Sequence, residues 1–547
     1  MKALFNLFFI ILILIEPIMA DLAVDLGHSW SYVQEQEEIY CPDSSSCNKI
    51  NWIALGDNSY KNGNYNEALE NYANAIEINE NYRSYDAVTR HHMADTLFKL
   101  GQYEEALQIY EKIQEEIDEA YGFGGSIWEI FENNENLKDL GATLIALDRY
   151  EDALSIFNKA IEDNSQDSVA LHGKGLALHK LEKSQDALAI YNVSSQINSS
   201  DSLMWKDKGD LHFDLNSYQE ALNCYEKALQ IYPSYADAWY GKANALVRLK
   251  RYEEALTSIN KCLDIDPSNI AAWNNKGATL VEMGRYSDAL TCYDESIKKS
   301  PNFATALANK AEALLFTGKY IEAMNYSNKS LEIDSDSAFA WAINGKALAA
   351  LGRYDKALIS FNKSLEMDSS KADTWIAKGN ALQKLGKNED ALRSYKKVIE
   401  IDPSNIETII DIGIIQNILK QNEEALKSFD KVIALNSSNI LAWRGKADAQ
   451  SSLKDYASAL QSYDHVINLS SSDITAWKGK AESQHKLEKY ECALQSYEKV
   501  LSIDPSDLIA QKGKAEVQNK LGKSSEAKKK KKKVAALDST DSNVWKG

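Results

Sequence analysis

Residues 236–269 read ADAWYGKANALVRLKRYEEALTSINKCLDIDPSN, and residues 270–303 read IAAWNNKGATLVEMGRYSDALTCYDESIKKSPNF. Both stretches have a Trp near the start, a small residue four positions later, Tyr and Ala in the second half, and Pro close to the end. Self-similarity at a fixed period of a few tens of residues is the signature of a repeat architecture. The 34-residue spacing therefore takes precedence over any local assignment of structure.

The same pattern recurs along most of the chain. Two units fill 49–120, and twelve more run without a gap over 134–541. One position in the second half of the unit holds Ala in all fourteen. The units begin at Lys49, Ala87, Asn134, Ser168, Ser202, Ala236, Ile270, Ala304, Ala338, Ala372, Ile406, Ile440, Ile474 and Leu508.

Each unit is predicted to form two helices. The Trp and the small residue four positions later share one helix face, and so do the Ala of the second half and an aromatic or apolar residue one turn further on. Pro near the end of several units stops the second helix before the next unit begins. The whole chain has only 7 Pro and 25 Gly in 547 residues, which is low for a loop-rich or all-β protein. We therefore predict an all-α fold.

This set of spaced Trp, Gly, Tyr, Ala and Pro residues resembles the tetratricopeptide repeat family over nearly all of 49–541. The resemblance implies a solenoid of paired antiparallel helices, wound as a right-handed superhelix, with the first helices lining a concave groove. It also implies that the groove binds peptides or protein partners.

One departure from the family pattern concerns a position that usually holds Leu. A Lys stem can lie on apolar surface while its ammonium stays in water, so this departure does not argue against the fold. Nine units carry the Lys: Lys174, Lys208, Lys242, Lys276, Lys310, Lys378, Lys446, Lys480 and Lys514.

The composition excludes several classes of protein. With 44% apolar and 26% charged residues, the chain is neither intrinsically disordered nor collagen-like. Its formal net charge of −19 repels phosphate, so we expect no nucleic-acid partner.

The first twenty residues are predicted to be a cleaved signal peptide. Lys2 precedes a run of about a dozen mostly apolar residues, and Ala20 supplies a small residue at the end of the segment. The alternative, a membrane anchor, requires a longer run, since about twelve residues reach roughly 18 Å across a hydrocarbon core of roughly 30 Å. We therefore expect an extracytoplasmic protein, secreted or at the cell surface, with no transmembrane span in the mature chain.

Cysteine usage is consistent with export. In the N-terminal segment 21–48, Cys41 and Cys47 bracket a short loop-like stretch, and an oxidising compartment would allow them to pair in a disulfide. The other four cysteines lie inside helical patterns and are expected to be small core residues: Cys224, Cys262, Cys292 and Cys492.

An insertion of thirteen residues at 121–133 interrupts the register. Ser126 and Glu129 form a capping-box pattern, which predicts a Gly-rich loop followed by a first helix lengthened by two turns. Phe123, Trp128 and Phe131 then either form an aromatic docking ridge or pack the longer helix onto its neighbours, and the packing role is favoured.

The C-terminal end carries six consecutive lysines, Lys528, Lys529, Lys530, Lys531, Lys532 and Lys533. One hypothesis is a patch for anionic lipid or nucleic acid, and the favoured one is a polar cap that closes the array. Residues 542–547, with Trp545 at the Trp position of the unit, resemble the truncated start of a further unit.

No catalytic motif is found in its required context. The chain has no phosphate-binding Gly loop, no nucleophile elbow, no His-Glu-x-x-His and no paired-Cys zinc spacing. We expect no enzyme activity, no cofactor and no metal, and we assign no role to the scattered histidines.

Candidate groove residues follow from their places on the first helices. The central units offer neutral amides and rings suited to hydrogen-bonding a peptide backbone. The last units instead place a cation four residues before a carboxylate: Arg444 with Asp448, Lys478 with Glu482, and Lys512 with Glu516. These are expected to be pairs within one helix, the alternative being a mixed-charge track for a charged ligand. The central candidates are Tyr240, Asn244, Asn274, Asn275, Asn309 and Phe339.

The sequence thus predicts a non-enzymatic scaffold, exported from the cytoplasm, that holds a protein or peptide partner in its groove. The alternatives are a structural spacer of the cell envelope and an accessory subunit of a surface-modifying enzyme. The oligomeric state does not follow from the sequence.

Overall fold

The computed structural model describes residues 44–77, 83–121 and 127–522. Within these ranges the regular elements are all helices, and no strand occurs. The all-α prediction is confirmed. The signal segment 1–20, Cys41, Phe123, Lys528 to Lys533 and 542–547 lie outside the described residues.

Consecutive helices pair into antiparallel hairpins. The first helix of each hairpin begins near the start of a sequence unit. From Ser168 onward, each first helix begins at the first residue of the 34-residue period. The first helices are α2 (Ser44–Lys61), α4 (Arg83–Lys99), α6 (Ile127–Ala146), α8 (Ser168–Lys180), α10 (Ser202–Asp214), α12 (Ala236–Arg248), α14 (Ile270–Glu282), α16 (Ala304–Phe316), α18 (Ala338–Ala350), α20 (Ala372–Lys384), α22 (Ile406–Ile418), α24 (Ile440–Ser452) and α26 (Ile474–Lys486).

The second helices complete the hairpins, and residues 508–522 are helical after the last of them. They are α3 (Tyr65–Glu77), α5 (Tyr103–Tyr121), α7 (Tyr150–Asp163), α9 (Ser184–Ile197), α11 (Tyr218–Ile231), α13 (Tyr252–Ile265), α15 (Tyr286–Lys299), α17 (Tyr320–Ile333), α19 (Tyr354–Met367), α21 (Asn388–Ile401), α23 (Asn422–Leu435), α25 (Tyr456–Leu469) and α27 (Tyr490–Ile503).

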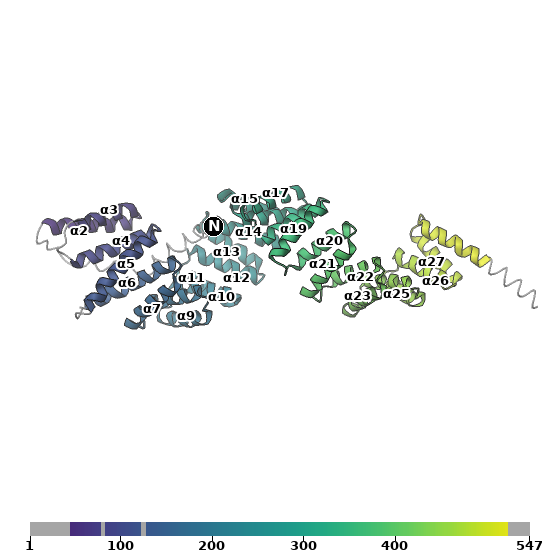
Figure 1. Ribbon diagram of the computed structural model, residues 1–547, viewed down its shortest axis with the longest axis horizontal. Helices are drawn as coiled ribbons and strands as arrows, with labels where there is room; N and C mark the ends of the chain where they lie inside the picture. Colours follow the sequence, from purple (N-terminus) through teal and green to yellow (C-terminus); the bar gives the residue numbers. More distant parts are fainter. Residues whose placement is uncertain (1–43, 78–82, 122–126, 523–547) are drawn as a thin grey trace, which may run out of the picture. The chain divides into compact units, whose positions relative to one another are not determined.

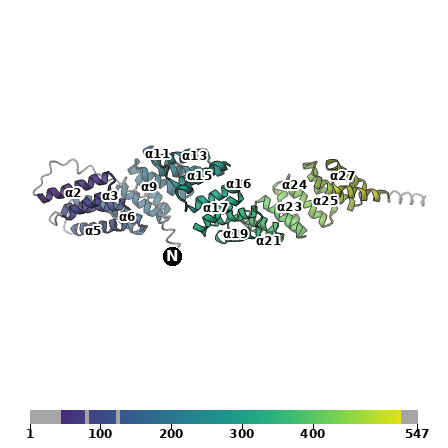
Figure 2. The ribbon, with the colours of Figure 1, turned by 90° about the horizontal axis from the view of Figure 1, so that it is seen from above.

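The chain divides into two compact units at residue 295, within α15. In the N-terminal unit each helix from α2 to α14 packs against the next, and in the C-terminal unit the same holds from α16 to α27. Figures 1 and 2 show the hairpins of each unit side by side in chain order. Each unit is therefore a stack in which a hairpin contacts mainly its neighbours, as expected for a repeat protein.

The core of each stack is built from the positions that recur in the sequence. Thirteen members of the invariant Ala series fall in the described residues, and each is 0% exposed. Four residues further on, Tyr225 is buried between Gly209 of its own unit and Gly241 of the next. A Cβ atom on either Gly would come within 2.7 Å of the Tyr225 ring, so only Gly allows the ring to fit. The alanines are Ala68, Ala106, Ala153, Ala187, Ala221, Ala255, Ala289, Ala323, Ala357, Ala391, Ala425, Ala459 and Ala493.

The Trp and Lys of the first helix bind the preceding unit. Trp239 Nε1 donates to the carbonyl oxygen of Pro233 at 2.9 Å, which fixes the turn before α12. Lys242 Nζ lies 5.3 Å from the centroid of the Trp239 ring and 3.0 Å from Oε1 of Glu226 on α11. Trp443 with Lys446 and Trp477 with Lys480 repeat this arrangement in the C-terminal unit. The Lys that departs from the family pattern thus stacks on a ring and pairs with a neighbouring carboxylate.

The interruptions of the repeat lengthen the helices beside them. α6 begins at Ile127, two turns before the unit start at Asn134, as the capping-box pattern predicted. The side chains of 120–133 are not described, so the role of Trp128 and Phe131 stays a prediction. α2 begins at Ser44, five residues before the expected start, and so includes Cys47 in a helix instead of a loop.

Candidate functional site

A cavity of about 780 Å³ lies on the first-helix side of the N-terminal unit. α8, α10 and α12 supply most of its lining, which combines carboxylates, amides, rings and a buried lysine. Two predicted groove residues, Tyr240 and Asn244, are part of this lining. The cavity is the candidate site, and its charged members include Lys206, Asp210, Asp214 and Asp237.

The predicted amides meet at the α12 side of this cavity. Asn275 Nδ2 on α14 donates to Tyr240 Oη at 2.8 Å and to Asn244 Oδ1 at 3.0 Å. Asn274, which is buried, donates from Nδ2 to Asn275 Oδ1 at 3.2 Å. Burial raises the pKa of Tyr240, so the phenol stays protonated and keeps its donor. Four of the six central candidates therefore form one hydrogen-bonded cluster, which we call the amide cluster.

The other two central candidates lie in the C-terminal unit. Asn309 is on α16, and Phe339 on α18 is 42% exposed. They therefore belong to a different compact unit from the amide cluster.

A buried ionic network runs beneath the α8 and α10 side of the cavity. Lys206 Nζ lies 3.0 Å from Asp210 Oδ2 and 3.4 Å from Asp207 Oδ1, and His172 Nε2 lies 2.8 Å from Asp207 Oδ2. Tyr225 Oη donates to Asp210 Oδ1 at 2.6 Å. His172, Lys206 and Asp207 are all less than a tenth exposed. These charges therefore hold one another in place, with His172 and Asp207 buried and Lys206 and Asp210 at the border of the cavity.

Their pKa shifts follow from that pairing. Burial opposes ionisation of Asp207, but the charge of Lys206 and the hydrogen bond with His172 outweigh burial and hold the pKa of Asp207 well below its usual range. Burial likewise disfavours the charged form of His172, yet Asp201 and Asp207 raise its pKa. The pairing thus favours the charged forms of Lys206, Asp207 and His172.

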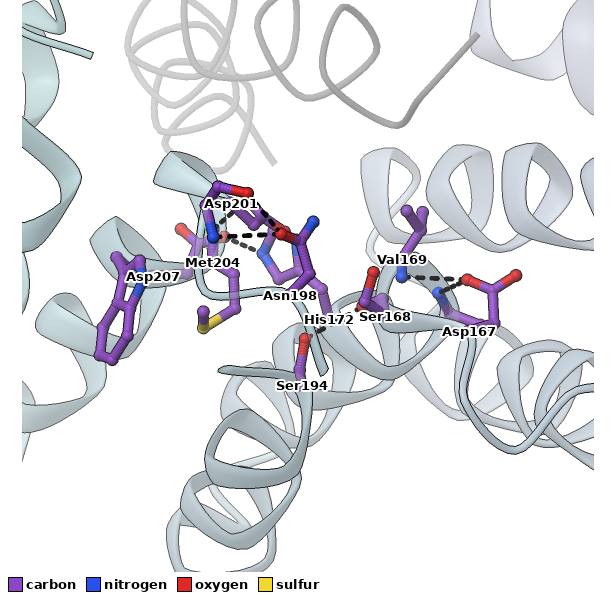
Figure 3. Close-up of polar contacts among 12 residues, drawn as sticks. Asp167, Ser168, Val169, His172, Ser194, Asn198, Asp201, Met204 and Asp207 are labelled. Atoms are coloured by element: carbon purple, nitrogen blue, oxygen red, sulfur yellow. Dashed lines mark hydrogen bonds and ion pairs between the residues drawn. The ribbon is translucent and has the colours of Figure 1, made fainter. Parts of the chain in front are cut away.

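Aspartates at the starts of the first helices make two kinds of contact, one with each carboxylate oxygen. Asp167 Oδ1 accepts from the backbone N–H groups of Val169 and Ala170, both at 3.0 Å, and Asp201 Oδ1 accepts from that of Met204 at 2.9 Å (Figure 3). The other oxygen of Asp201 lies 3.6 Å from Nδ1 of His172 in the preceding unit. Each Asp thus caps its own helix and receives a cation from the previous one.

The same arrangement corrects the expectation for the last units. Arg444 Nη1 lies 3.5 Å from Asp473 Oδ2, and Lys478 Nζ donates to Asp507 Oδ2 at 2.9 Å. Both cations therefore reach the capping Asp of the next unit rather than the carboxylate four residues on in their own helix. Asp448 instead accepts a hydrogen bond from Tyr463 at 2.7 Å. Lys512, at the matching place in 508–522, is exposed.

Sequence reasoning missed a second polar cluster on α4 and α6. His91 Nε2 lies 3.0 Å from Asp139 Oδ2 and 3.6 Å from Asp95 Oδ1, and Tyr110 Oη donates to Asp95 Oδ1 at 2.5 Å. Burial opposes protonation of His91, but Asp95 and Asp139 outweigh it and raise the pKa of His91 to about 9. His91, Asp95 and Asp139 lie close enough to hold a metal ion, and protonation of His91 offsets the charge of one of the two carboxylates.

The contacts between first helices of consecutive units follow a regular spacing in the sequence, from which they could have been predicted. His172 and Asp207, His179 and Asp214, and Tyr240 and Asn275 are each 35 residues apart, one period plus one. The cation-to-cap pairs are 29 apart, as in Arg444 and Asp473. In a stack with a 34-residue period, these separations join one first helix to the next.

In the described part of the chain, no helix is both long enough and apolar enough to cross a bilayer.

Family models described as "Tetratricopeptide repeat" match eight stretches of the chain. They cover residues 49–115, 138–201, 206–270, 270–303, 304–337, 340–371, 372–405 and 475–507. The search of curated proteins found no match.

Three solved structures resemble the chain at low identity. The Cut9-Hcn1 hetero-tetramer of the APC/C matches at 16% identity, covering 86% of this chain and 96% of its own, with a TM-score of 0.43. YrrB, described as a repeat protein with an unusual peptide-binding site, matches at 24% identity over 34% of this chain and 95% of its own, with a TM-score of 0.30. A repeat protein from Parabacteroides merdae matches at 18% identity over 46% and 99%, with a TM-score of 0.39.

Proposed function

Because the chain belongs to the tetratricopeptide repeat family, we propose that it is a non-enzymatic scaffold that binds a protein or peptide along its first helices. The observation that carries this proposal is the cavity between α8, α10 and α12, with the amide cluster at one side. A cavity with a few convergent polar groups is the usual form of a binding site.

The amide cluster suits the backbone of an extended peptide. An Asn side chain offers both donors and an acceptor, as a peptide group does, so it can bind a backbone without reading the side chains. Asn275 uses both of its N–H groups within the cluster, so its Oδ1 is the atom that can accept from a peptide N–H group. Hydrogen bonds among Tyr240, Asn244 and Asn275 already fix these side chains, so little rotamer freedom is lost on binding. The buried network of Lys206 and Asp207 beneath them adds rigidity.

The partner's side chains would be selected by the charged lining. Asp214 is two-thirds exposed and pairs with His179 at 2.9 Å, so a ligand cation can compete for the carboxylate. Phe213 and Leu215 supply apolar surface beside it. Such a site favours a peptide that carries both an apolar and a basic side chain.

The test is saturable peptide binding by the full-length mature chain. A library of unstructured peptides provides the probes, and the double variant Asn244→Ala with Asn275→Ala is expected to weaken the selected peptide roughly tenfold, since about two hydrogen bonds are lost. Asn223→Ala, on the exposed face of α11, is the matched control and should bind normally. Absence of saturable binding at high peptide concentration would contradict the proposal and favour a spacer role.

We also propose that the protein acts outside the cytoplasm. The support is the sequence of residues 1–20, in which a charged start, an apolar run and a small residue at Ala20 follow the pattern of an export signal. Mass spectrometry of the protein from its native cells should find a mature chain that begins at Asp21. A cytoplasmic chain that retains the apolar run would contradict export.

A further inference from the structure

α5 carries the densest negative charge among the second helices. Seven carboxylates and a single cation, Lys112, occupy its nineteen residues. By contrast, α21 balances three carboxylates with three cations, and α25 contains one Asp. The carboxylates of α5 are all exposed: Glu104, Glu105, Glu111, Glu115, Glu116, Asp118 and Glu119.

Three of these carboxylates line a second cavity. Glu111, Glu115 and Asp118 are spaced as i, i+4 and i+7, so they lie on one face of α5. They border a cavity of about 460 Å³ that α6 and α7 complete. We call this surface the acidic face. It is built on the second helices α5 and α7 with the first helix α6, and it shares no lining residue with the amide cluster.

The lining of the acidic face suits a lysine side chain. The apolar floor consists of the partly exposed Ile156 of α7 and the edges of Leu140 and Leu144 of α6, which are each 3% exposed. The three carboxylates of α5 and Asp152 of α7 surround that floor. A Lys side chain has an apolar stem and a charged end, so the stem can lie on the floor while the ammonium meets the carboxylates.

The one cation in the lining does not neutralise this surface. Arg149 Nη2 pairs with Asp152 Oδ2 at 2.8 Å and leaves the carboxylates of α5 to other partners. Gln114 donates a hydrogen bond to Asp118 Oδ1 at 3.0 Å without adding charge. The acidic face therefore keeps a net negative charge.

The chain itself contains the complementary segment. Lys528 to Lys533 are six consecutive lysines in a protein of net charge −19, and they lie at the other end of the sequence from α5. We propose that the Lys528–Lys533 run of one copy docks on the acidic face of a second copy. The proposal does not depend on the groove function, because it uses a different surface.

Such a contact determines how the copies assemble. It joins two different surfaces, so each copy still has one free acidic face and one free lysine run, and further copies can add. Exposed ion pairs are individually weak and are screened by salt within about 8 Å at physiological ionic strength. The assembly should therefore grow with protein concentration and dissociate at high salt.

The experiment is sedimentation velocity on the full mature chain at low and high salt, with two complementary variants. The first replaces each of Lys528 to Lys533 by Gln, and the second combines Glu111→Gln, Glu115→Gln and Asp118→Asn. The wild-type protein should self-associate at low salt. In molar salt its association constant should be at least tenfold lower. Each variant alone should be a monomer, but an equimolar mixture should form a one-to-one complex, because each supplies the surface that the other lacks.

Two controls separate this contact from general charge effects. Glu253→Gln, Glu322→Gln and Glu423→Gln together remove the same charge from exposed positions on other second helices and should leave association unchanged. Asn244→Ala with Asn275→Ala should also associate normally, so failure of the groove function leaves this test intact. Circular dichroism establishes that each variant is folded.

The proposal is overturned if wild type stays monomeric at low salt, if the Lys→Gln variant still associates, or if the charge control dissociates equally. It is also overturned if the mixture of variants does not form a complex. Binding of the lysine run to anionic vesicles by a protein that does not self-associate would assign the run to a membrane surface instead.

Discussion

Asp207 on α10 and Asp411 on α22 occupy the same place in their repeats, yet their pKa values shift in opposite directions. At Asp207, burial is outweighed by Lys206 and His172, and the pKa falls. At Asp411, burial and then Glu407 raise the pKa, because the preceding residue is Ile410 where α10 has Lys206. The residue before the aspartate thus decides whether the ionised carboxylate in this position is stabilised, as at Asp207, or destabilised, as at Asp411.

The difference extends over the surrounding helices. α8 and α10 contact each other through charges, whereas Ile409 and Ile410 of α22 pack with Phe429 and Val432 in an apolar cluster. Both regions keep the same helical hairpins. The repeat positions that fill the core therefore specify the fold, while adjacent positions of the first helix are free to be charged or apolar.

The strongest test of this comparison is to remove each aspartate. Asp207→Ala leaves Lys206 and His172 buried without their counter-charge and should destabilise α8 to α11 by about 3–5 kcal/mol. Asp411→Ala should change stability by less than about 1 kcal/mol, since folding already disfavours its charge. Hydrogen exchange followed by mass spectrometry measures both regions in one chain. Equal effects at the two sites would refute the comparison.

Truncation of Ile410 tests the apolar region of the comparison, α22. Ile410 is 6% exposed, and Ile410→Ala should cost about 2–4 kcal/mol through lost burial and the cavity it leaves. Ile414→Ala, at a position 37% exposed, is the control and should cost less than about 1 kcal/mol. Urea unfolding detects the difference. A small effect at Ile410 would mean that α22 depends on something other than its core.

Raising the pH should weaken the N-terminal unit through His91. The folded pKa of about 9 lies above the ordinary value near 6.5, so protonated His91 stabilises the fold fully below about pH 6.5. That contribution, about 3 kcal/mol, is lost as the pH rises through about 9. The urea concentration at the midpoint of unfolding should therefore fall as the pH is raised from 6 to 10. For His91→Gln this midpoint should depend less on pH.

His465→Gln is the control for this titration, because His465 stacks on Trp443 in the C-terminal unit. It should keep the slope of wild type. If His91→Gln keeps that slope too, the pairing with Asp95 and Asp139 does not contribute to stability.

The fold could be predicted from the sequence because it depends on positions that repeat. The invariant alanines and the glycines around each ring appear in unit after unit, so their spacing indicates two helices and a stack. The amide cluster was predicted only as separate residues on the first-helix face. Its hydrogen bonds join Asn275 to Tyr240 across units, which requires the alignment of successive helices as well as the pattern within one.

The ionic contacts were harder to predict because each occurs in only some units. Arg444 has a carboxylate four residues on, which favours a pair within the helix, but Asp473 is fixed near it by capping the next helix. His91 has no motif at all, since its partner Asp139 is separated from it by the irregular insertion as well as by a repeat. Such contacts depend on the three-dimensional alignment of two helices, which a single unit of sequence does not specify.

The smallest expected effect concerns the turn between the two helices of a hairpin. The same substitution in this turn should have the same effect on stability in the N-terminal and the C-terminal unit. Lys250 and Lys420 occupy the turn position with φ of 60°, where Gly284 and other units have Gly. A side chain is disfavoured at positive φ, so Lys250→Gly and Lys420→Gly should each stabilise the protein by about 0.5–1 kcal/mol. Gly284→Ala should destabilise it by about 1 kcal/mol, and a Cβ there meets nothing within 4 Å, so the backbone alone is tested. Thermal unfolding of the three variants measures the effect, and different signs at Lys250 and Lys420 would show that the two regions differ in their scaffold as well as in their surface.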